Sequence, residues 1–304
     1  MRAFVTGGHG FVGPWLCRHL TESGDDVVVA DPSVDVTNSV AVRDALEHAQ
    51  PDVVYHLAAQ SSVSSSWDAP ADTFTVNALG TLHVLAAVRA VSPKARVVFA
   101  SSVEVYGVVR LSDLPITETV PFQPATPYAA SKAAAEMVAL QATLGWGLDV
   151  IRARPFNHTG PGQTDRFFVP SMARQIVEAA RTGASELRTG DLTVRRDILD
   201  VRDVVRAYRL LAERGLPGEV YNICSGQSVA LEQVLQRLLV LARSDMRVTT
   251  DPARLRPVDL PDLRGDPSHL RYATGWMPEY PLDETLVDVL DYWRTQPVVA
   301  PGAG

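Results

Sequence analysis

A tyrosine and a lysine four residues apart form the clearest chemical signature of this chain. They are Tyr128 and Lys132, in the run Tyr-Ala-Ala-Ser-Lys, and on a helix their side chains would lie on one face. An ammonium close to a phenol lowers the pKa of the phenol, so that the phenol can exchange a proton near neutral pH. The pair therefore predicts acid–base chemistry. The alternative is a chance spacing, with the tyrosine packed in the core and the lysine in solvent.

A glycine-rich turn near the start of the chain adds a candidate phosphate-binding site. Gly7, Gly10 and Gly13 follow a short apolar run at intervals of three residues. Glycines permit the unusual dihedral angles of such a turn and allow a pyrophosphate to approach the backbone. The helix expected from Phe11 would direct its N-terminus toward the phosphates. Together with the Tyr–Lys pair, the turn favours a redox enzyme that uses a nicotinamide dinucleotide, whereas an ordinary strand–helix turn is the alternative.

Asp31 indicates which dinucleotide would be used. It lies where the second strand should end, about twenty residues after the glycines, where a carboxylate can accept hydrogen bonds from both adenosine-ribose hydroxyls. Such a carboxylate repels a 2′-phosphate, and no arginine follows Asp31 within three residues to attract one. The sequence therefore predicts NAD, with NADP as the alternative cofactor. A turn-starting aspartate ahead of Pro32 is the other interpretation.

Short β-branched runs alternate with longer helical patterns through the first half of the chain. Strands are expected at residues 3–6, 27–30, 53–57, 97–101 and 149–153, and helices at 11–23, 40–50, 71–91 and 127–144. The strands are apolar at nearly every position, as happens when helices cover both faces of a parallel sheet. This pattern predicts an α/β fold built on a Rossmann doubly wound parallel sheet.

After Pro155 the pattern loosens, and a smaller C-terminal α/β substrate lobe is expected. Helices are expected at residues 171–182, within 197–213, at 231–242 and at 282–294, with strands at 219–222 and 247–250. The predicted domains are a Rossmann domain of residues 1–156, to which 197–225 return, and a substrate-binding lobe of 157–196 and 226–297. The tail, 298–304, is expected to be disordered.

Composition and charge exclude several other classes of protein. The chain has 304 residues and a net charge of −7, which argues against nucleic-acid binding because that function needs a basic face. Its two cysteines, Cys17 and Cys224, are too few for a disulfide framework and badly spaced for a metal site. Neither His9 nor His158 has partners at ligand spacing, so no metal is expected. No apolar run reaches membrane-spanning length and no signal peptide is evident, so a cytoplasmic protein without membrane contact is expected.

These motifs resemble those of the extended short-chain dehydrogenase/reductases, the family of NAD-dependent epimerases and dehydratases that act on nucleotide sugars. The resemblance rests on residues 6–13, His56-Leu57-Ala58-Ala59, Asn77, Ser101-Ser102, Tyr106-Gly107, Tyr128 with Lys132, and Arg154-Pro155-Phe156-Asn157. It implies cofactor contacts, in addition to the glycines, Asp31, Tyr128 and Lys132, at Phe11, Val12, Asp35, Val36, Leu57, Ala58, Ala59, Asn77 and Pro155. Asn77 would also help to order the active-site helix.

A narrower similarity points to the reductases of GDP-4-keto-6-deoxy-mannose and to the related GDP-mannose 4,6-dehydratases. It rests on Ser61-Ser62-Val63, Ser66-Trp67, residues 80–85, 156–163 and 200–203, Arg196-Asp197, Leu255-Arg256-Pro257, Gly265-Asp266 and Gly275-Trp276. It implies a nucleotide sugar as substrate, with a GDP-sugar favoured, bound by Ser62, Asn157, Val169, Arg196 and Arg256. The two arginines would bind the diphosphate. A solvated ion pair is the alternative for either arginine.

In such an enzyme Ser102, Tyr128 and Lys132 would form the catalytic triad. Tyr128 would donate a proton to the substrate oxygen while hydride reaches C4, Ser102 would fix that oxygen, and Lys132 would hold the nicotinamide ribose. The predicted function is an NAD(P)-dependent 4-ketoreductase of a GDP-6-deoxyhexose. Glu104 keeps an alternative open, a 4,6-dehydratase or epimerase with tightly bound, recycled NAD and Glu104 as its base. A nucleotide-binding protein without catalysis is the remote alternative.

Two alanine-rich helices suggest how copies of the chain would associate. They are the helices expected at residues 71–91 and 127–144, and alanine permits close approach of helices. By resemblance they would form a four-helix bundle in a homodimer. Packing within one chain is the alternative.

Overall fold

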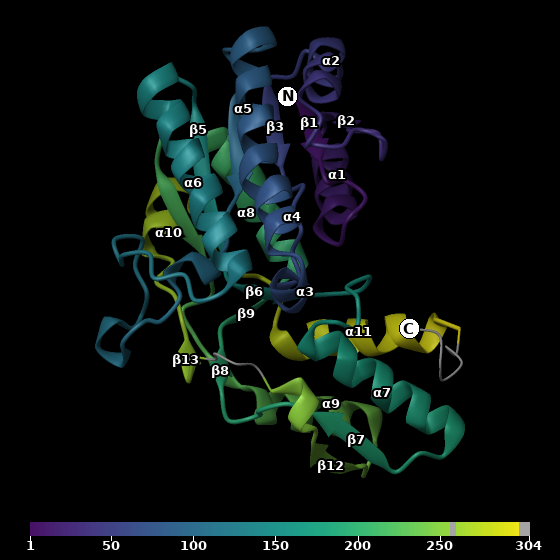
Figure 1. The fold of residues 1–304 in the computed structure, drawn as a ribbon. Helices are drawn as coiled ribbons and strands as arrows, with labels where there is room; N and C mark the ends of the chain where they lie inside the picture. Colours follow the sequence, from purple (N-terminus) through teal and green to yellow (C-terminus); the bar gives the residue numbers. More distant parts are fainter. Residues whose placement is uncertain (256–259, 298–304) are drawn as a thin grey trace.

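A parallel sheet of six strands forms the centre of the larger part of the molecule (Figure 1). The computed structural model describes residues 1–255 and 260–297. The strands are β1 (Arg2–Thr6), β2 (Asp26–Val29), β3 (Val53–His56), β4 (Arg96–Ala100), β5 (Val150–Pro155) and β10 (Val220–Ile223). Their order is β2-β1-β3-β4-β5-β10, with parallel pairing throughout. The predicted Rossmann doubly wound sheet is confirmed.

Helices cover both faces of this sheet and bury its apolar side chains in two hydrophobic clusters. One face is covered by α1 (Val12–Glu22), α8 (Val201–Arg214) and α10 (Ser268–Thr274), and the other by α2 (Ser39–Ala49), α5 (Gly80–Val91) and α6 (Pro127–Trp146). Successive residues of β1 enter opposite clusters, Ala3 and Val5 on one side and Phe4 on the other. Burial on both faces explains why the strands are apolar throughout.

Local sequence defines both ends of α6, the helix that carries Tyr128 and Lys132. The side chain of Thr126 accepts a hydrogen bond from the N–H of Ala129 at 3.0 Å, and Pro127 occupies the first helical position. The helix ends at Gly147, whose φ of 71° is the left-handed conformation that terminates many helices.

The helix expected at residues 71–91 is divided into three parts. It consists of α4 (Pro70–Phe74), a π-helical turn η1 (Thr75–Leu79) and α5. Among the described residues, Pro70–Val91 is the one helix that is long and apolar enough to cross a membrane by length and composition. The expectation that no apolar run reaches that length is therefore wrong. A single such helix is weak evidence for a membrane, and this one packs against α2 and α6 within the fold.

A smaller lobe lies beyond the carboxyl ends of the sheet strands (Figure 1). Its helices are α7 (Phe168–Thr182), α9 (Leu231–Ala242) and α11 (Leu282–Thr295), which share a hydrophobic cluster. Its strand pairs are β7 (Glu186–Thr189) with β12 (Arg247–Thr250), β6 (Asn157–Thr159) with β9 (Ile198–Asp200), and β8 (Arg195–Arg196) with both β11 (Val229–Ala230) and β13 (Asp262–Leu263). The remaining short helices of the described chain are α3 (Val63–Asp68), η2 (Val103–Tyr106), η3 (Leu111–Asp113) and η4 (Pro252–Arg254).

Helix α7 begins three residues earlier than expected, and its first turn contains Pro170. Proline lacks an N–H, but the N–H groups of a first helical turn have no partner within the helix, so proline is tolerated there. The expected range of 171–182 left Pro170 outside the helix, and that helix start is wrong.

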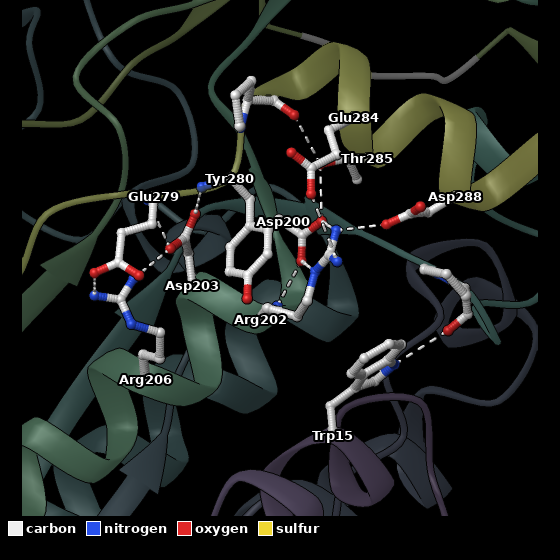
Figure 2. A network of polar contacts seen from close by, with 12 residues as sticks. Trp15, Asp200, Arg202, Asp203, Arg206, Glu279, Tyr280, Glu284, Thr285 and Asp288 are labelled. Carbon is white, nitrogen blue, oxygen red and sulfur yellow. Dashed lines mark hydrogen bonds and ion pairs between the residues drawn. The ribbon is translucent and has the colours of Figure 1, made fainter.

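A network of ion pairs joins α8, which covers the sheet, to α11 in the smaller lobe (Figure 2). Arg202 donates hydrogen bonds to Asp200 at 2.8 Å and to Asp288 at 2.7 Å, and its guanidinium lies 3.9 Å from the ring centre of Tyr280. Asp203 accepts a hydrogen bond from the backbone N–H of Tyr280 at 3.1 Å. These contacts fix the smaller lobe against the sheet-covering helix.

Candidate active site

The carboxyl ends of five neighbouring strands bring the predicted site residues to one edge of the sheet. Gly7 follows β1, Asp31 lies just beyond β2, Ala58 beyond β3, Ser102 beyond β4 and Asn157 beyond β5. In open parallel sheets, ligands bind in the crevice outside this edge, at the point where the strand order reverses. Here the order reverses between β1 and β3.

The glycine turn after β1 is packed too closely for side chains. Gly7 has a φ of 70°, and a Cβ atom there would lie 2.6 Å from the backbone nitrogen of Ala58. A Cβ atom on Gly13 would lie 2.3 Å from the carbonyl oxygen of Gly8. Helix α1 begins at Val12, directly after the turn. This cradle of bare backbone at a helix N-terminus fits a pyrophosphate.

The residues after β2 differ in exposure. Asp31 is exposed, and its Oδ1 accepts hydrogen bonds from the Ser33 hydroxyl at 2.6 Å and the Ser33 N–H at 2.9 Å. These bonds lower the pKa of Asp31, so it carries the negative charge expected of a ribose ligand. Asp35 is also exposed, whereas the side chain of Val36 is buried in the core against Gly80. Contacts of Asp35 and Val36 with an adenine stay predictions.

A buried histidine connects β3 to the strand beneath the glycine turn. His56 shares a hydrogen bond between its Nδ1 and the Thr6 hydroxyl at 2.8 Å, and between its Nε2 and the Thr81 hydroxyl at 3.0 Å. Burial lowers the pKa of His56 to about 3, so the ring is neutral. The N–H groups of Leu57 and Ala58 donate to the backbone oxygen and hydroxyl of Thr6. The β3 end therefore lies firmly against the turn.

The structure brings Ser102, Tyr128 and Lys132 together at the end of β4 and the start of α6, where all three are buried. The Tyr128 hydroxyl interacts with the side chain of Ser102. The Ser102 hydroxyl also accepts a hydrogen bond from the N–H of Glu104 at 3.2 Å. Lys132 Nζ donates to the carbonyl oxygen of Ala100 at 2.5 Å. These positions suit a group of side chains that acts on one substrate oxygen.

The pKa of Tyr128 departs from the expectation drawn from the sequence. Burial raises the pKa of Tyr128 to about 12, its hydrogen bond with Ser102 lowers it in part, and Glu104 raises it further. Burial lowers the pKa of Lys132 to about 8, and its ammonium is bound to the backbone oxygen of Ala100. The expected lowering of the phenol pKa by Lys132 is therefore wrong in this structure. At neutral pH the phenol is protonated, which is the form that a proton donor requires.

Two side chains position the N-terminal part of α6. Asn77, in the π-helical turn, donates to the Ser131 hydroxyl at 2.9 Å and to the Gln60 carbonyl at 3.1 Å. The hydroxyl of Ser66 accepts a hydrogen bond from the N–H of Tyr128 at 3.1 Å. Asn77 is buried, so its observed contacts order the active-site helix, and its contact with a cofactor stays a prediction. Single π turns often occur at functional sites.

Asn157 and His158 are the first two residues of β6, directly after β5, and their side chains differ in hydrogen bonding. The Oδ1 atom of Asn157 is buried and has no hydrogen-bond partner in the protein. A bound ligand could supply the missing donor. His158 Nδ1 shares a hydrogen bond with the Phe156 carbonyl at 2.9 Å, and its ring stacks on Phe11 at 6.1 Å. Within the described ranges, no three His, Cys, Asp or Glu side chains gather as a metal site would require.

The other predicted substrate residues that the structure describes lie on three different elements. Ser62 caps α3, and Val169 is buried in the first turn of α7. Arg196 is also buried and donates to two backbone carbonyls, at 2.7 and 2.8 Å. Arg256 lies outside the described residues. Their contacts with a nucleotide sugar stay predictions.

Next to the triad on α6 lies a buried ion pair that no sequence motif indicated as part of the site. Glu136 and Arg154 are joined at 2.5 Å. Glu136 follows Lys132 by four residues, so helical spacing places it on the same face of α6. This spacing was available from the sequence, but nothing local shows that the glutamate is buried.

Three comparisons place the chain among known proteins. The family model described as GDP-mannose 4,6 dehydratase matches residues 32–289. A GDP-6-deoxy-D-mannose reductase from Pseudomonas aeruginosa is 39% identical over 298 residues, covering 97% of this chain and 98% of that protein. A GDP-mannose 4,6-dehydratase from Vibrio cholerae is 26% identical, covering 95% of this chain and 92% of the relative.

Among solved structures, that of RMD from Pseudomonas aeruginosa complexed with NADPH superposes with a TM-score of 0.90. It is 38% identical to this chain, and the match covers 97% of each chain. The family match and the identity over nearly the whole length agree with the sheet edge, the glycine cradle and the triad. The chain belongs to the GDP-mannose 4,6 dehydratase family, within the extended short-chain dehydrogenase/reductases.

Proposed function

We propose that the protein is an NAD(P)-dependent reductase of the 4-keto group of a GDP-6-deoxyhexose. The observation that carries this proposal is the buried group of Ser102, Tyr128 and Lys132 at the same sheet edge as the glycine cradle. It occurs in a chain 39% identical to a GDP-6-deoxy-D-mannose reductase.

The residues at the sheet edge fit a nicotinamide dinucleotide. The turn of Gly7 and Gly13 leaves bare backbone for the pyrophosphate, and the charged Asp31 suits ribose hydroxyls. When bound, the reduced dinucleotide supplies the hydride for the substrate carbonyl. The similar RMD structure was solved with NADPH, whereas Asp31 favours NADH. Initial rates with NADH and NADPH at equal concentrations decide between them.

The chain's own residues supply the proton and orient the carbonyl. The protonated Tyr128 donates to the C4 oxygen as hydride reaches C4, so the ketone becomes an alcohol and the phenol regains its proton from solvent. The Ser102 hydroxyl binds the same oxygen and holds it near Tyr128. The Lys132 ammonium would bind the ribose next to the nicotinamide.

A 4,6-dehydratase is the second candidate, because Glu104 acts electrostatically on Tyr128 and the matched family carries that name. A reductase consumes one reduced cofactor for each ketone, whereas a dehydratase shows no net change of cofactor. Two incubations separate them, GDP-mannose alone and GDP-4-keto-6-deoxy-mannose with reduced cofactor. We expect cofactor oxidation with the ketone and no conversion of GDP-mannose. Conversion of GDP-mannose without added cofactor would exclude the reductase.

We also propose a homodimer formed through α4, α5 and α6. These helices lie side by side (Figure 1). Together with the turn η1 between α4 and α5, they leave large apolar side chains exposed, among them Leu79 of η1 at 42% and Met137 and Leu144 of α6 at 45% and 78%. A second copy packed on the same helices would complete a four-helix bundle and cover these side chains.

Light scattering after size-exclusion chromatography tests the dimer. We expect the wild-type mass to be twice that of the chain, and Met137→Glu to shift it to the monomer mass. Val240→Glu, on α9 in the smaller lobe and 75% exposed, is the control that should leave the mass unchanged. A monomeric wild-type protein at micromolar concentration would exclude this interface.

A further inference from the structure

A pair of opposite charges, taken out of water, lies directly behind the catalytic lysine. Glu136 is 0% exposed and Arg154 3% exposed. The Nη2 atom of Arg154 donates to Oε1 of Glu136 at 2.5 Å, and its Nε lies 3.1 and 3.0 Å from the two carboxylate oxygens. Removing two charges from water is costly, so a buried pair is weak evidence of a stabilising function. Its location suggests a different role.

The carboxylate of Glu136 joins α6 to β5 and to the segment that follows β4. Its Oε2 accepts a hydrogen bond from the Ser101 hydroxyl at 2.5 Å, and Ser101 precedes Ser102 at the end of β4. Its Oε1 lies 3.6 Å from Arg152 of β5. Glu136 itself is one helical turn after Lys132. Its carboxylate therefore touches the neighbours of two members of the triad.

The guanidinium of Arg154 holds the loop that runs from η2 to α6. Its Nη1 donates to the Tyr106 hydroxyl at 2.6 Å and to the Glu118 carbonyl at 3.1 Å. The Tyr106 hydroxyl donates to Oδ1 of Asn222 at 2.7 Å, and Nδ2 of Asn222 donates to the Ile116 carbonyl at 2.9 Å. This loop separates Ser102 from Tyr128 in the chain, so the network joins every segment that carries a triad residue.

We infer that Glu136 and Arg154 are positioning residues of the redox centre, which fix Lys132 and Ser102 relative to Tyr128 through α6 and the end of β4. The inference rests on the proposed function, because it assigns both residues to the same centre. A merely structural ion pair would change the free energy of unfolding alone. A positioning pair also changes turnover and the protonation of Lys132.

Charge gives Glu136 a second effect on Lys132. The titratable groups around the Tyr128–Lys132 pair are Glu136 on α6, His56 on β3, Glu104 on η2, Arg152 and Arg154 on β5, and Tyr208 on α8. Burial lowers the pKa of Lys132 to about 8, and Glu136 opposes that decrease. A neutral residue in place of Glu136 would lower the pKa further, so the ammonium would be lost at a lower pH.

The test is the Glu136→Gln variant, with the pH dependence of kcat/KM for the reduced cofactor as readout, because this constant reports groups of the free enzyme. We expect the alkaline limb of this pH profile, where kcat/KM falls at high pH, to move to lower pH. We also expect kcat to fall by about tenfold to a hundredfold. Glu136→Asp keeps the charge and should restore the limb toward its wild-type position.

The pair of Arg96 and Asp149 provides the matched control. It joins the other ends of β4 and β5, away from the triad, at 2.8 Å. Asp149→Asn should lower the unfolding temperature while leaving kcat and the alkaline limb unchanged. If Glu136→Gln behaves in the same way as Asp149→Asn, the positioning role is excluded.

Two further variants keep the inference testable if Glu136→Gln does not fold. Ser101→Ala removes one hydrogen bond to Glu136, and Arg154→Lys removes the forked contact, while both leave the charges in place. Each should lower kcat by about tenfold without moving the alkaline limb. Wild-type kcat in both folded variants would overturn the inference.

Binding of NADPH or NADH, followed by cofactor fluorescence without any sugar, separates this inference from the proposed function. The affinity of the wild-type protein for the cofactor should fall as Lys132 loses its proton. In Glu136→Gln this fall should occur at lower pH. In Ser101→Ala, the control without a change of charge, it should occur at the same pH as in the wild type. If the wild-type protein turns over no GDP-4-keto sugar but the binding curve of Glu136→Gln is shifted in this way, the proposed function fails and the role of Glu136 stands. An unshifted curve in Glu136→Gln excludes that role.

Discussion

The network around Glu136 and the network around Arg202 are both built on pairs of an arginine and a carboxylate, and they join different parts of the molecule. The pair of Glu136 and Arg154 has no appreciable exposure, and its partners are the segments that carry the triad. In the second network the side chains of Arg202 and Asp288 are 22% and 34% exposed, and they join α8 to α11 (Figure 2). Burial determines how much water and salt weaken each pair. We call Glu136 and Arg154 with their partners the inner network, and Arg202 and Asp288 with theirs the outer network. The stability supplied by the inner pair is therefore sensitive to loss of one partner, and that supplied by the outer pair is sensitive to salt.

The largest effect on turnover is expected for a substitution of Tyr128, the proposed proton donor. Tyr128→Phe removes the proton donor, so turnover should fall about 10²–10⁴-fold while the unfolding temperature stays near that of the wild type. Steady-state assays and thermal unfolding measure the two quantities. The exposed Tyr272, on α10, offers a control in Tyr272→Phe, which should change neither. Turnover above one tenth of wild type in Tyr128→Phe would remove this residue from the mechanism.

Loss of one inner charge should give the largest effect on stability. Glu136→Ala leaves Arg154 buried without its carboxylate, so the free energy of unfolding should fall by about 3–5 kcal/mol. Urea unfolding at low salt and at high salt measures this change, and added salt should leave it nearly unaltered. A loss below about 1 kcal/mol would place the inner pair in the same class as exposed pairs.

The outer network should give the smallest effect. Asp288→Asn removes one partner of Arg202, which keeps Asp200, so unfolding should become easier by only about 0–1 kcal/mol. The same urea titrations should show that this difference shrinks at about 1 M salt, where screening is strong. A larger loss that salt does not reduce would show that the two networks are energetically alike.

Much of the fold could be predicted from local patterns. The strands of the main sheet and most helices lie within a few residues of their expected ranges, because apolar runs and helical periodicity depend on nearby residues. The start of α7 and the π turn at Asn77 were not predicted, since they depend on how a first turn and a helix are packed. The Tyr128–Lys132 pair could be predicted from its spacing, and Ser102 was assigned through the family resemblance. The raised pKa of Tyr128 could not be predicted, because burial is a property of the whole fold.

The sequence by itself determined the order of strands and helices, the glycine turn and the placement of Tyr128 and Lys132 on one helical face, because each depends on a few consecutive residues. Only the tertiary structure decided that Glu136 meets Arg154, 18 positions away on another element, and that Lys132 bonds to Ala100. Contacts between distant segments and the removal of water arise from packing. These contacts and the loss of water determine the protonation of the side chains at the site, and no pattern of consecutive residues predicts them.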